Sequence, residues 1–123
     1  MSISWKLSTD RQIWLQLEEI LTQRVVSGQY PPGVRIPSVR DLAAEAGVNP
    51  NTMQRTLAAM EEAGLLTSQR NTGRFVTQDT ALIRATRDAL AQRELSLFRE
   101  KMKQLGYSGQ EIKQLLTEVE PHE

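Results

Sequence analysis

Apolar residues recur every three or four positions along several stretches of this chain, and each of these stretches predicts an amphipathic helix. The first stretch follows the Ser-Thr-Asp segment at residues 8–10, whose side chains favour the N-cap position. Gly28 stands where a C-terminal glycine is expected to end this helix. Trp5 and Trp14 lie near its start, where they either pack the helix entry or take part in a dimer contact. The apolar stripe consists of Ile13, Leu17, Ile20, Leu21 and Val25.

Two shorter helical patterns occupy the middle of the chain. Ser38, with an aspartate three residues later, resembles a capping box at the start of the first, which Gly47 ends. Asn49 is a favourable N-cap for the second, and Pro50 falls at the first helical position, where its missing N–H is not needed. The expected inward faces consist of Val39, Leu42, Ala43 and Ala46 in the first helix and of Met53, Leu57 and Met60 in the second. Two short helices joined in this way are typical of a helix-turn-helix.

Two short extended runs follow the second of these helices, at residues 65–69 and 74–77. The Arg-Asn-Thr-Gly segment between them is turn-like, so that the two runs predict a β-hairpin. Residues 34–36, ahead of the helix pair, are long enough only for a very short strand. A helix-turn-helix followed by a hairpin is the winged arrangement.

The rest of the chain is helical by pattern. Apolar residues recur from about residue 80 to residue 105, and Ser108 forms another capping-box signature before a short last helix. The predicted fold class is therefore mainly α with a small β-hairpin. We expect a winged helix-turn-helix domain at residues 1–78 and a two-helix C-terminal segment at residues 79–123.

Composition excludes several classes of protein. With 123 residues, 39% hydrophobic and 24% charged, the chain can form one compact domain and a short appendage. It has no cysteine, and its single histidine, His122, lies in the terminal tail, so we predict no metal site and no cofactor. We also find no nucleophile–base pair and no phosphate-binding glycine loop, which argues against an enzyme. The start lacks the apolar region of a signal peptide, and no apolar run approaches membrane-spanning length. We therefore expect a cytoplasmic protein without a membrane partner.

Charge is unevenly distributed, although Lys+Arg and Asp+Glu both total 15. Between residues 35 and 78 all five cations are arginines, the side chain suited to bidentate contacts with phosphate and guanine. Polar residues crowd the start of the second helix of the helix-turn-helix, which is the part that faces a DNA groove. These features predict a DNA-binding protein whose affinity depends on a few arginines.

Ordered motifs extend over roughly residues 13–76. They are Gly28-Gln29-Tyr30-Pro31-Pro32-Gly33, Arg35-Ile36-Pro37-Ser38-Val39-Arg40-Asp41-Leu42-Ala43, Gly47-Val48-Asn49, Thr52-Met53 with Leu57, Glu61-Glu62-Ala63-Gly64-Leu65-Leu66, and Gly73-Arg74-Phe75-Val76. In this order they resemble the GntR family of bacterial transcription regulators. The short C-terminal extension is similar to that of the YtrA-like subfamily, whereas larger members carry an effector-binding domain for which we expect no room here.

The resemblance implies a role in DNA binding for Arg35, Ser38, Arg40, Asn49, Asn51, Thr52, Gln54, Arg55, Gly73 and Arg74. Arg40 resembles an arginine that contacts a base or a phosphate, and Arg35 a basic residue near the backbone. Gly73 and Arg74 match the wing tip, which in this family approaches the minor groove. Pro50 departs from the pattern, because some members carry a base-reading arginine there. Asn71 replaces a glycine at the first bend of the wing, where asparagine tolerates a positive φ.

The two C-terminal helices are too short to bury their own apolar stripe well. They either pack back on the winged domain or pair with a second copy of the chain. A two-fold dimer contacts two half-sites of an inverted repeat in double-stranded DNA, which favours the homodimer. The expected dimerisation residues are Leu82, Leu90, Leu97, Phe98, Met102, Leu105, Ile112, Leu115 and Leu116.

The function that we expect is that of a dimeric repressor, which covers an operator and blocks the polymerase. The subfamily resemblance implies a nearby transporter operon as the target. The alternative is a winged-helix module that binds another protein without sequence-specific DNA binding, which the neutral total charge permits. The sequence leaves open whether a small effector binds between the tail helices and the winged domain or none exists.

Overall fold

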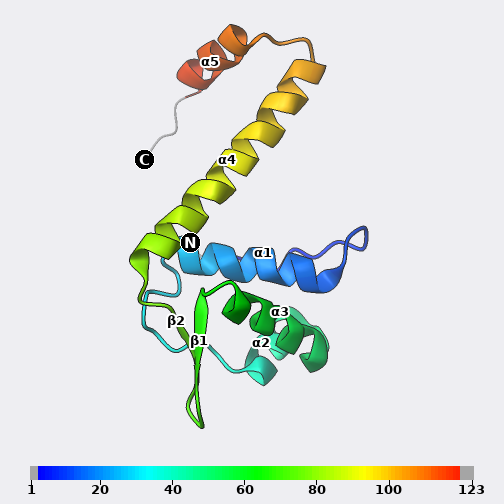
Figure 1. The fold of residues 1–123 in the computed structure, drawn as a ribbon. Helices are drawn as coiled ribbons and strands as arrows, with labels where there is room; N and C mark the ends of the chain where they lie inside the picture. Colours follow the sequence, from blue (N-terminus) through cyan, green and yellow to red (C-terminus); the bar gives the residue numbers. More distant parts are fainter. Residues whose placement is uncertain (1–2, 120–123) are drawn as a thin grey trace. The chain divides into compact units, whose positions relative to one another are not determined.

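The structure is a computed structural model that describes residues 3–119, and these residues form five helices and a two-stranded antiparallel sheet (Figure 1). In chain order the elements are α1 (Ile13–Val26), α2 (Val39–Ala46), α3 (Pro50–Glu62), β1 (Leu66–Gln69), β2 (Gly73–Val76), α4 (Thr80–Gln104) and α5 (Gly109–Glu118). This order confirms the predicted fold class. The chain divides into two compact units, one ending at Arg87 and the other beginning at Asp88, which we call the winged unit and the C-terminal unit.

A single apolar core holds the winged unit together. It lies where α1 and α2 pack against α3, with β1 also against α3. Leu17, Leu42 and Met53, one from each helix, are fully buried, whereas Val39 and Ala46, which we predicted to face inward, are only half-buried. Because full burial of such a side chain contributes about 1.5–3 kcal/mol, the shared core fixes the three helices and the hairpin as one body. The core consists of Leu17, Leu21, Val25, Ile36, Leu42, Ala43, Met53, Leu57, Met60, Leu66 and Val76.

The start of α1 differs from the prediction, because the helix begins at Ile13 and its N-cap is Gln12, not a residue of the Ser-Thr-Asp segment. The buried side chain of Gln16 reaches back over that segment. Its Oε1 accepts a hydrogen bond from the N–H of Ser8 (2.8 Å), and its Nε2 donates to the carbonyl of Ser8 (2.9 Å). The hydroxyl of Ser8 donates to the carboxylate of Asp10. The polar groups of residues 8–10 are thus used within a loop and do not cap the helix.

The predicted N-caps of the other short helices are confirmed, but Asp41 does not return the second hydrogen bond that a capping box at Ser38 requires. The hydroxyl of Ser38 accepts the N–H of Asp41 at the start of α2 (3.1 Å), and Oδ1 of Asn49 accepts a backbone N–H at the start of α3 (2.7 Å). The capping box at Ser108 is complete, with both reciprocal hydrogen bonds to Glu111. Each such cap is worth about 1 kcal/mol, so these local sequences set where the helices begin.

The wing is the hairpin β1–β2, in which Leu66 pairs with Val76. Its turn contains Asn71 at a φ of 62°, so asparagine adopts the positive φ that we expected of it. At residues 34–36, where we expected at most a very short strand, the structure has one antiparallel bridge between Arg35 and Phe75. This bridge fixes the segment before α2 against the edge of the wing.

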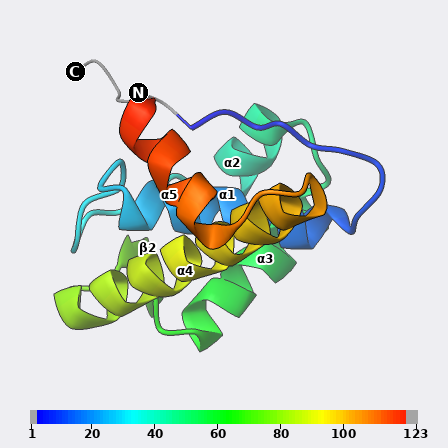
Figure 2. The same cartoon turned by 90° about the horizontal axis from the view of Figure 1, so that it is seen from above.

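The C-terminal unit contains the later part of α4 and all of α5. Figures 1 and 2 show α4 as one continuous helix that leads into this unit. Exposed large apolar residues of the unit are Leu95, Leu97, Phe98, Leu105, Tyr107, Leu116 and Val119. Of the other predicted dimerisation residues, Leu90, Met102 and Leu115 are half-buried, Ile112 is buried, and Leu82 belongs to the winged unit. Within residues 3–119 no helix has the length and apolar character needed to span a bilayer.

A buried arginine ties the segment before α1 to α1 and α2. The side chain of Arg24 is 3% exposed, and its Nη2 donates to the carboxylate of Glu45 (2.9 Å) and to the carbonyl of Ile3 (2.9 Å). Its Nη1 donates to the hydroxyl of Tyr30 (2.7 Å). The guanidinium carbon also lies 4.4 Å from the ring centroid of Trp5, whose Nε1 donates to the same carboxylate. Several partners therefore replace the water that this charge loses.

We predict that Arg24→Ala lowers the free energy of unfolding by about 2–4 kcal/mol, because it removes packing and a set of buried charge-assisted hydrogen bonds. The matched control is Arg11→Ala. Arg11 pairs with Glu19, but the two side chains are 51% and 36% exposed, so its removal should cost far less stability than the loss of Arg24. Urea unfolding followed by circular dichroism measures both losses. Equal losses of stability in the two variants would show that the buried contacts of Arg24 contribute no more than an exposed ion pair.

Candidate nucleic-acid interface

The second helix of the helix-turn-helix, α3, is the recognition helix, and it presents polar side chains at its start. Asn51 and Gln54 are exposed, and Thr52 is half-buried. Within residues 3–119 the side-chain amides of Asn51 and Gln54 have no hydrogen-bond partner, whereas Asn49 uses its side chain as the N-cap. Since the core occupies the opposite face of α3, these two amides are available to a partner molecule.

Arg40 lies in the first turn of α2, close behind the N-cap Ser38. Its side chain is exposed, and no carboxylate of the described residues pairs with it. The hydroxyl of Ser38 is used for the cap, although it still has the capacity to donate. Arg40 therefore offers an unneutralised charge next to the helix pair.

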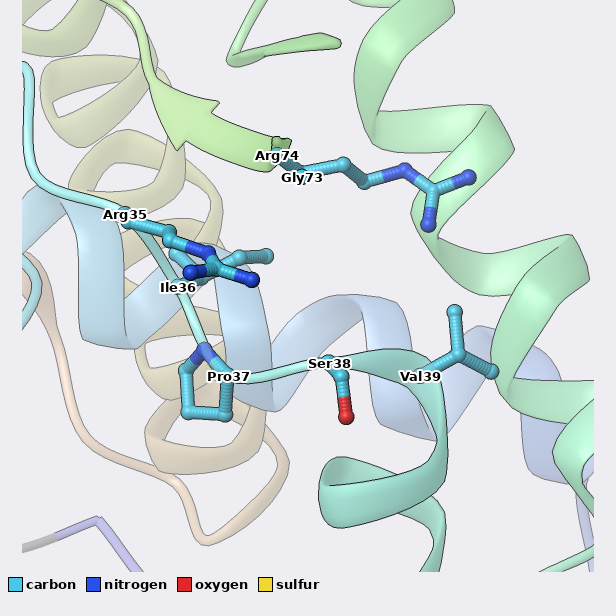
Figure 3. Close-up of a pocket in the computed structure, with 7 residues that line it drawn as sticks. All are labelled: Arg35, Ile36, Pro37, Ser38, Val39, Gly73 and Arg74. Carbon is cyan, nitrogen blue, oxygen red and sulfur yellow. The ribbon is translucent and has the colours of Figure 1, made fainter. Parts of the chain in front are cut away.

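A cavity of about 210 Å³ lies between the wing and the start of α2 (Figure 3). Arg35, Ser38, Gly73 and Arg74 line it, so that it brings together predicted DNA-binding residues from two separate segments. Gly73 has a φ of +130°, and a Cβ on it would lie 2.9 Å from Nε of Arg35. Only glycine fits here without displacing the arginine.

Arg74 is held within the molecule by an ion pair that the sequence analysis did not predict. Its Nε donates to the carboxylate of Glu61 on α3, and Figure 3 shows the side chain extending toward that helix. The hydroxyl of Ser68, on β1, donates to the same carboxylate (2.6 Å). The hydrogen bonds from Ser68 and Arg74 hold the pKa of Glu61 below its ordinary value. This cluster joins the wing to the recognition helix, and a DNA contact from Arg74 stays a prediction.

Arg55 also has a partner that the sequence did not reveal. Its guanidinium carbon lies 4.2 Å from the ring centroid of Trp14 on α1. The sequence shows Trp14 near the start of α1, but the spacing of residues within one helix contains no information about a side chain on another helix. Arg24 is a second arginine whose surroundings the sequence did not reveal. It lies on the same side of α1 as the apolar stripe and is therefore buried.

The available positive charge is thus smaller than the number of arginines indicates. Arg35, Arg40, Arg55 and Arg70 have no carboxylate partner among residues 3–119, whereas Arg74 is paired. The first three of these lie on or beside α2 and α3, and Arg70 lies in the wing turn. No cluster of three or more potential metal ligands occurs in the described part of the chain.

The structure is that of a winged helix-turn-helix transcription regulator. It has two capped helices joined by a turn, a buried core that they share, and a wing with arginines beside it. The family described as "Bacterial regulatory proteins, gntR family" matches residues 14–76. The chain belongs to this family, which confirms the resemblance seen in the motifs. The family comprises regulators and not enzymes, in agreement with the sequence analysis.

The relatives extend the likeness beyond the winged unit. The chain is 33% identical to the uncharacterized HTH-type transcriptional regulator YhcF of Bacillus subtilis, over 87% of this chain and 88% of YhcF. It is 26% identical to the HTH-type transcriptional repressor YtrA of the same organism, over 84% of this chain and 78% of YtrA, which supports the YtrA-like subfamily.

Solved structures show the same fold. A GntR family transcriptional regulator from Listeria monocytogenes superposes with a TM-score of 0.86 at 30% identity, over 93% of this chain and 100% of the other. The DNA-binding domain of AraR, solved in complex with operator ORX1, matches with a TM-score of 0.53 at 26% identity, over 58% of this chain and 87% of AraR(DBD). A domain of this family thus binds operator DNA through the fold that this chain shares.

We predict that Glu61→Gln weakens the link between wing and recognition helix and removes a pH-dependent part of the stability. A carboxyl with a lowered pKa stabilises the folded state above its ordinary pKa of 4.5, and this contribution disappears as the pH falls through the lower folded-state pKa. At pH 7 the variant should be less stable by about 1 kcal/mol, since the ion pair is partly exposed. The difference between the two proteins should begin to shrink below pH 4.5 and should disappear once the pH is below the lowered pKa of Glu61.

Thermal unfolding between pH 3 and pH 7 measures this effect. Glu62→Gln is the matched control, because Glu62 is the exposed neighbour on α3 with no partner in the described residues. A difference between Glu61→Gln and the parent that stays constant over the whole range would contradict the assignment.

Proposed function

We propose that this chain is a homodimeric repressor of the GntR family that binds an inverted-repeat operator in double-stranded DNA. The observation that carries the proposal is the group of arginines without a carboxylate partner among residues 3–119, Arg35, Arg40 and Arg55, beside an exposed recognition-helix start. A protein-binding module would not require this combination of free guanidinium groups and free side-chain amides. Because its target is chromosomal DNA, we place its action in the cytoplasm.

Affinity and sequence choice come from different residues in this proposal. The arginines bind phosphates, which supplies most of the affinity and makes it sensitive to salt. The amides of Asn51 and Gln54 have the donor and acceptor pair that matches adenine in the major groove. Pro50 contributes no side-chain hydrogen bond there, so base recognition depends on these neighbours.

The wing is proposed to approach the minor groove beside the site of the recognition helix. Gly73 lets Arg35 lie close to the wing backbone, which places one guanidinium at the junction of wing and α2. The Glu61–Arg74 pair keeps the wing fixed on α3, so that the wing and the recognition helix meet the DNA as one body. This rigidity reduces the ordering cost of binding.

The C-terminal unit is proposed to form the dimer. Its exposed apolar side chains include Leu97 and Leu116, which are more than half accessible in the single chain, and Phe98, which is somewhat less accessible. Pairing two copies buries them and places two recognition helices on two half-sites. The dimer on its operator would block the polymerase at neighbouring genes, of which the resemblance favours a transporter operon.

We predict that Arg40→Ala weakens binding to DNA from the promoter of its own gene by about 1–3 kcal/mol, or roughly 5- to 150-fold. Footprinting first defines the bound site, and fluorescence anisotropy on a labelled duplex of that site measures the affinity. The matched control is Arg84→Ala, an exposed arginine on α4. The parent should lose affinity steeply between low and physiological salt. Equal affinity for all fragments at every salt concentration would favour the protein-binding alternative.

We predict that Phe98→Glu dissociates the dimer, because it puts a charge on each side of a buried apolar contact. Sedimentation velocity should give the mass of two chains for the parent and of one chain for the variant. Leu15→Glu is the control, since Leu15 is an exposed leucine of the winged unit, 39% accessible. A parent that sediments as a single chain at micromolar concentration would contradict the proposed dimer.

A further inference from the structure

Arg55 and Trp14 form a contact between the recognition helix and the start of α1 that extends beyond the residues predicted to bind DNA. The guanidinium carbon of Arg55 lies 4.2 Å from the centroid of the indole ring. At this distance the electron-rich face of the ring attracts the cation. Arg55 is exposed and Trp14 is half-buried, so the stacked pair lies at the surface of the winged unit.

The indole is the fixed partner of this pair. Its Nε1 donates a hydrogen bond to Oε1 of Gln12 (2.7 Å), and the backbone carbonyl of Trp14 accepts one from Oγ1 of Thr56 (3.0 Å). Thr56 is fully buried in the interface between α1 and α3. Because the indole is hydrogen-bonded to Gln12 and the backbone of Trp14 to the buried Thr56, the tryptophan is the better anchored partner and the longer arginine side chain lies against it.

Arg55 lies one turn beyond Asn51, and successive residues of a helix point about 100° apart, so it also points in a different direction from Gln54. Asn51 lies four residues earlier on the same face of the helix, nearer its N-terminus. In helix-turn-helix complexes the first residues of the recognition helix contact the base edges. Arg55 lies one turn farther along, and the stack draws its guanidinium toward α1. On DNA we expect a group at this position to lie at the side of the groove, where the sugar–phosphate backbone runs.

The hydrogen-bonding capacity of Arg55 fits an anion. Within residues 3–119 the N–H groups of Arg55 donate no hydrogen bond, so they remain available beside the ring. No carboxylate of residues 3–119 pairs with Arg55, in contrast to Arg11, Arg24 and Arg74. In a chain of zero net charge, such an unneutralised guanidinium is well suited to bind a phosphate.

We propose that Arg55 and Trp14 form a phosphate clamp, in which Arg55 binds a backbone phosphate of the operator and Trp14 is its positioning residue. This inference rests on the proposed DNA binding and deepens it, because it adds the start of α1 to the interface. It also assigns Arg55 to affinity and not to base choice.

The first experiment compares Arg55→Ala, Trp14→Leu, Trp14→Phe and the double variant Arg55→Ala/Trp14→Leu on the footprinted duplex. Loss of a charged hydrogen bond predicts roughly tenfold weaker binding for Arg55→Ala. Trp14→Leu keeps an apolar side chain without an aromatic face and should weaken binding about three- to fivefold, whereas Trp14→Phe should stay within about twofold of the parent. The double variant should bind no more weakly than Arg55→Ala. Thermal unfolding of each variant monitors the fold.

The second experiment identifies the bound group. Duplexes in which one phosphate at a time is replaced by an uncharged methylphosphonate should weaken binding of the parent wherever the protein contacts that phosphate. One position in each half-site should weaken the parent but leave Arg55→Ala unchanged. The slope of the logarithm of the binding constant against the logarithm of the salt concentration should also become shallower, by about 0.9 for each phosphate that the variant no longer binds. These readouts depend on the DNA and not on the stability of α1.

Several outcomes would overturn the phosphate clamp. Trp14→Leu could weaken binding equally in the presence and absence of Arg55, Trp14→Phe could fail to restore binding, or no methylphosphonate position could be specific to Arg55. If Trp14→Leu does not fold, the Trp14→Phe variant and the methylphosphonate series still test whether Arg55 binds a phosphate. Failure of the proposed function is distinct: the parent itself would then show no preferred fragment, and Arg40→Ala would match the parent.

Discussion

The packing of α1 against α3 is the constraint on which the other features of the winged unit depend. Leu17 and Leu21 of α1 are buried, as are Leu57 and Met60 of α3. Because these residues occupy one face of the recognition helix, its polar residues are left on the opposite face. The same packing brings Trp14 beside Arg55. The orientation of the recognition helix and the surroundings of its arginine thus follow from one apolar contact.

The pairing of charges is the second factor that determines which side chains are available on the surface of the winged unit. The chain is neutral overall, and within residues 3–119 some arginines are paired inside the fold, whereas Arg35, Arg40 and Arg70 have no carboxylate partner. Arg24 is buried among aromatic rings and Glu45, and Arg74 is paired with Glu61. Arginines of the first kind bind parts of the protein to one another and so position the free ones. A neutral protein can in this way present a local positive surface without a general attraction to polyanions.

The sequence predicted the order of elements and most helix ends, because these depend on nearby residues. Ser38, Asn49 and Ser108 cap helices through backbone groups two or three residues away. Contacts between distant segments were not predictable in this way. Gln16 reaches back eight residues and so prevents the expected cap of α1. Glu61 pairs with a residue thirteen positions later. Such partners have no fixed spacing, and only the tertiary packing brings them together.

The segment ahead of α1 has a consequence for where the folded unit begins. The family match starts at residue 14, yet Ile3 is bonded through its N–H to Gln29 and through its carbonyl to Arg24. Trp5 packs against the core and covers the buried guanidinium. A fragment cut at the edge of the family signature would lose these partners and leave Arg24 open to water. The part of the chain that contributes to the folded winged unit is therefore longer than the family signature, because residues ahead of α1 supply partners to its buried arginine.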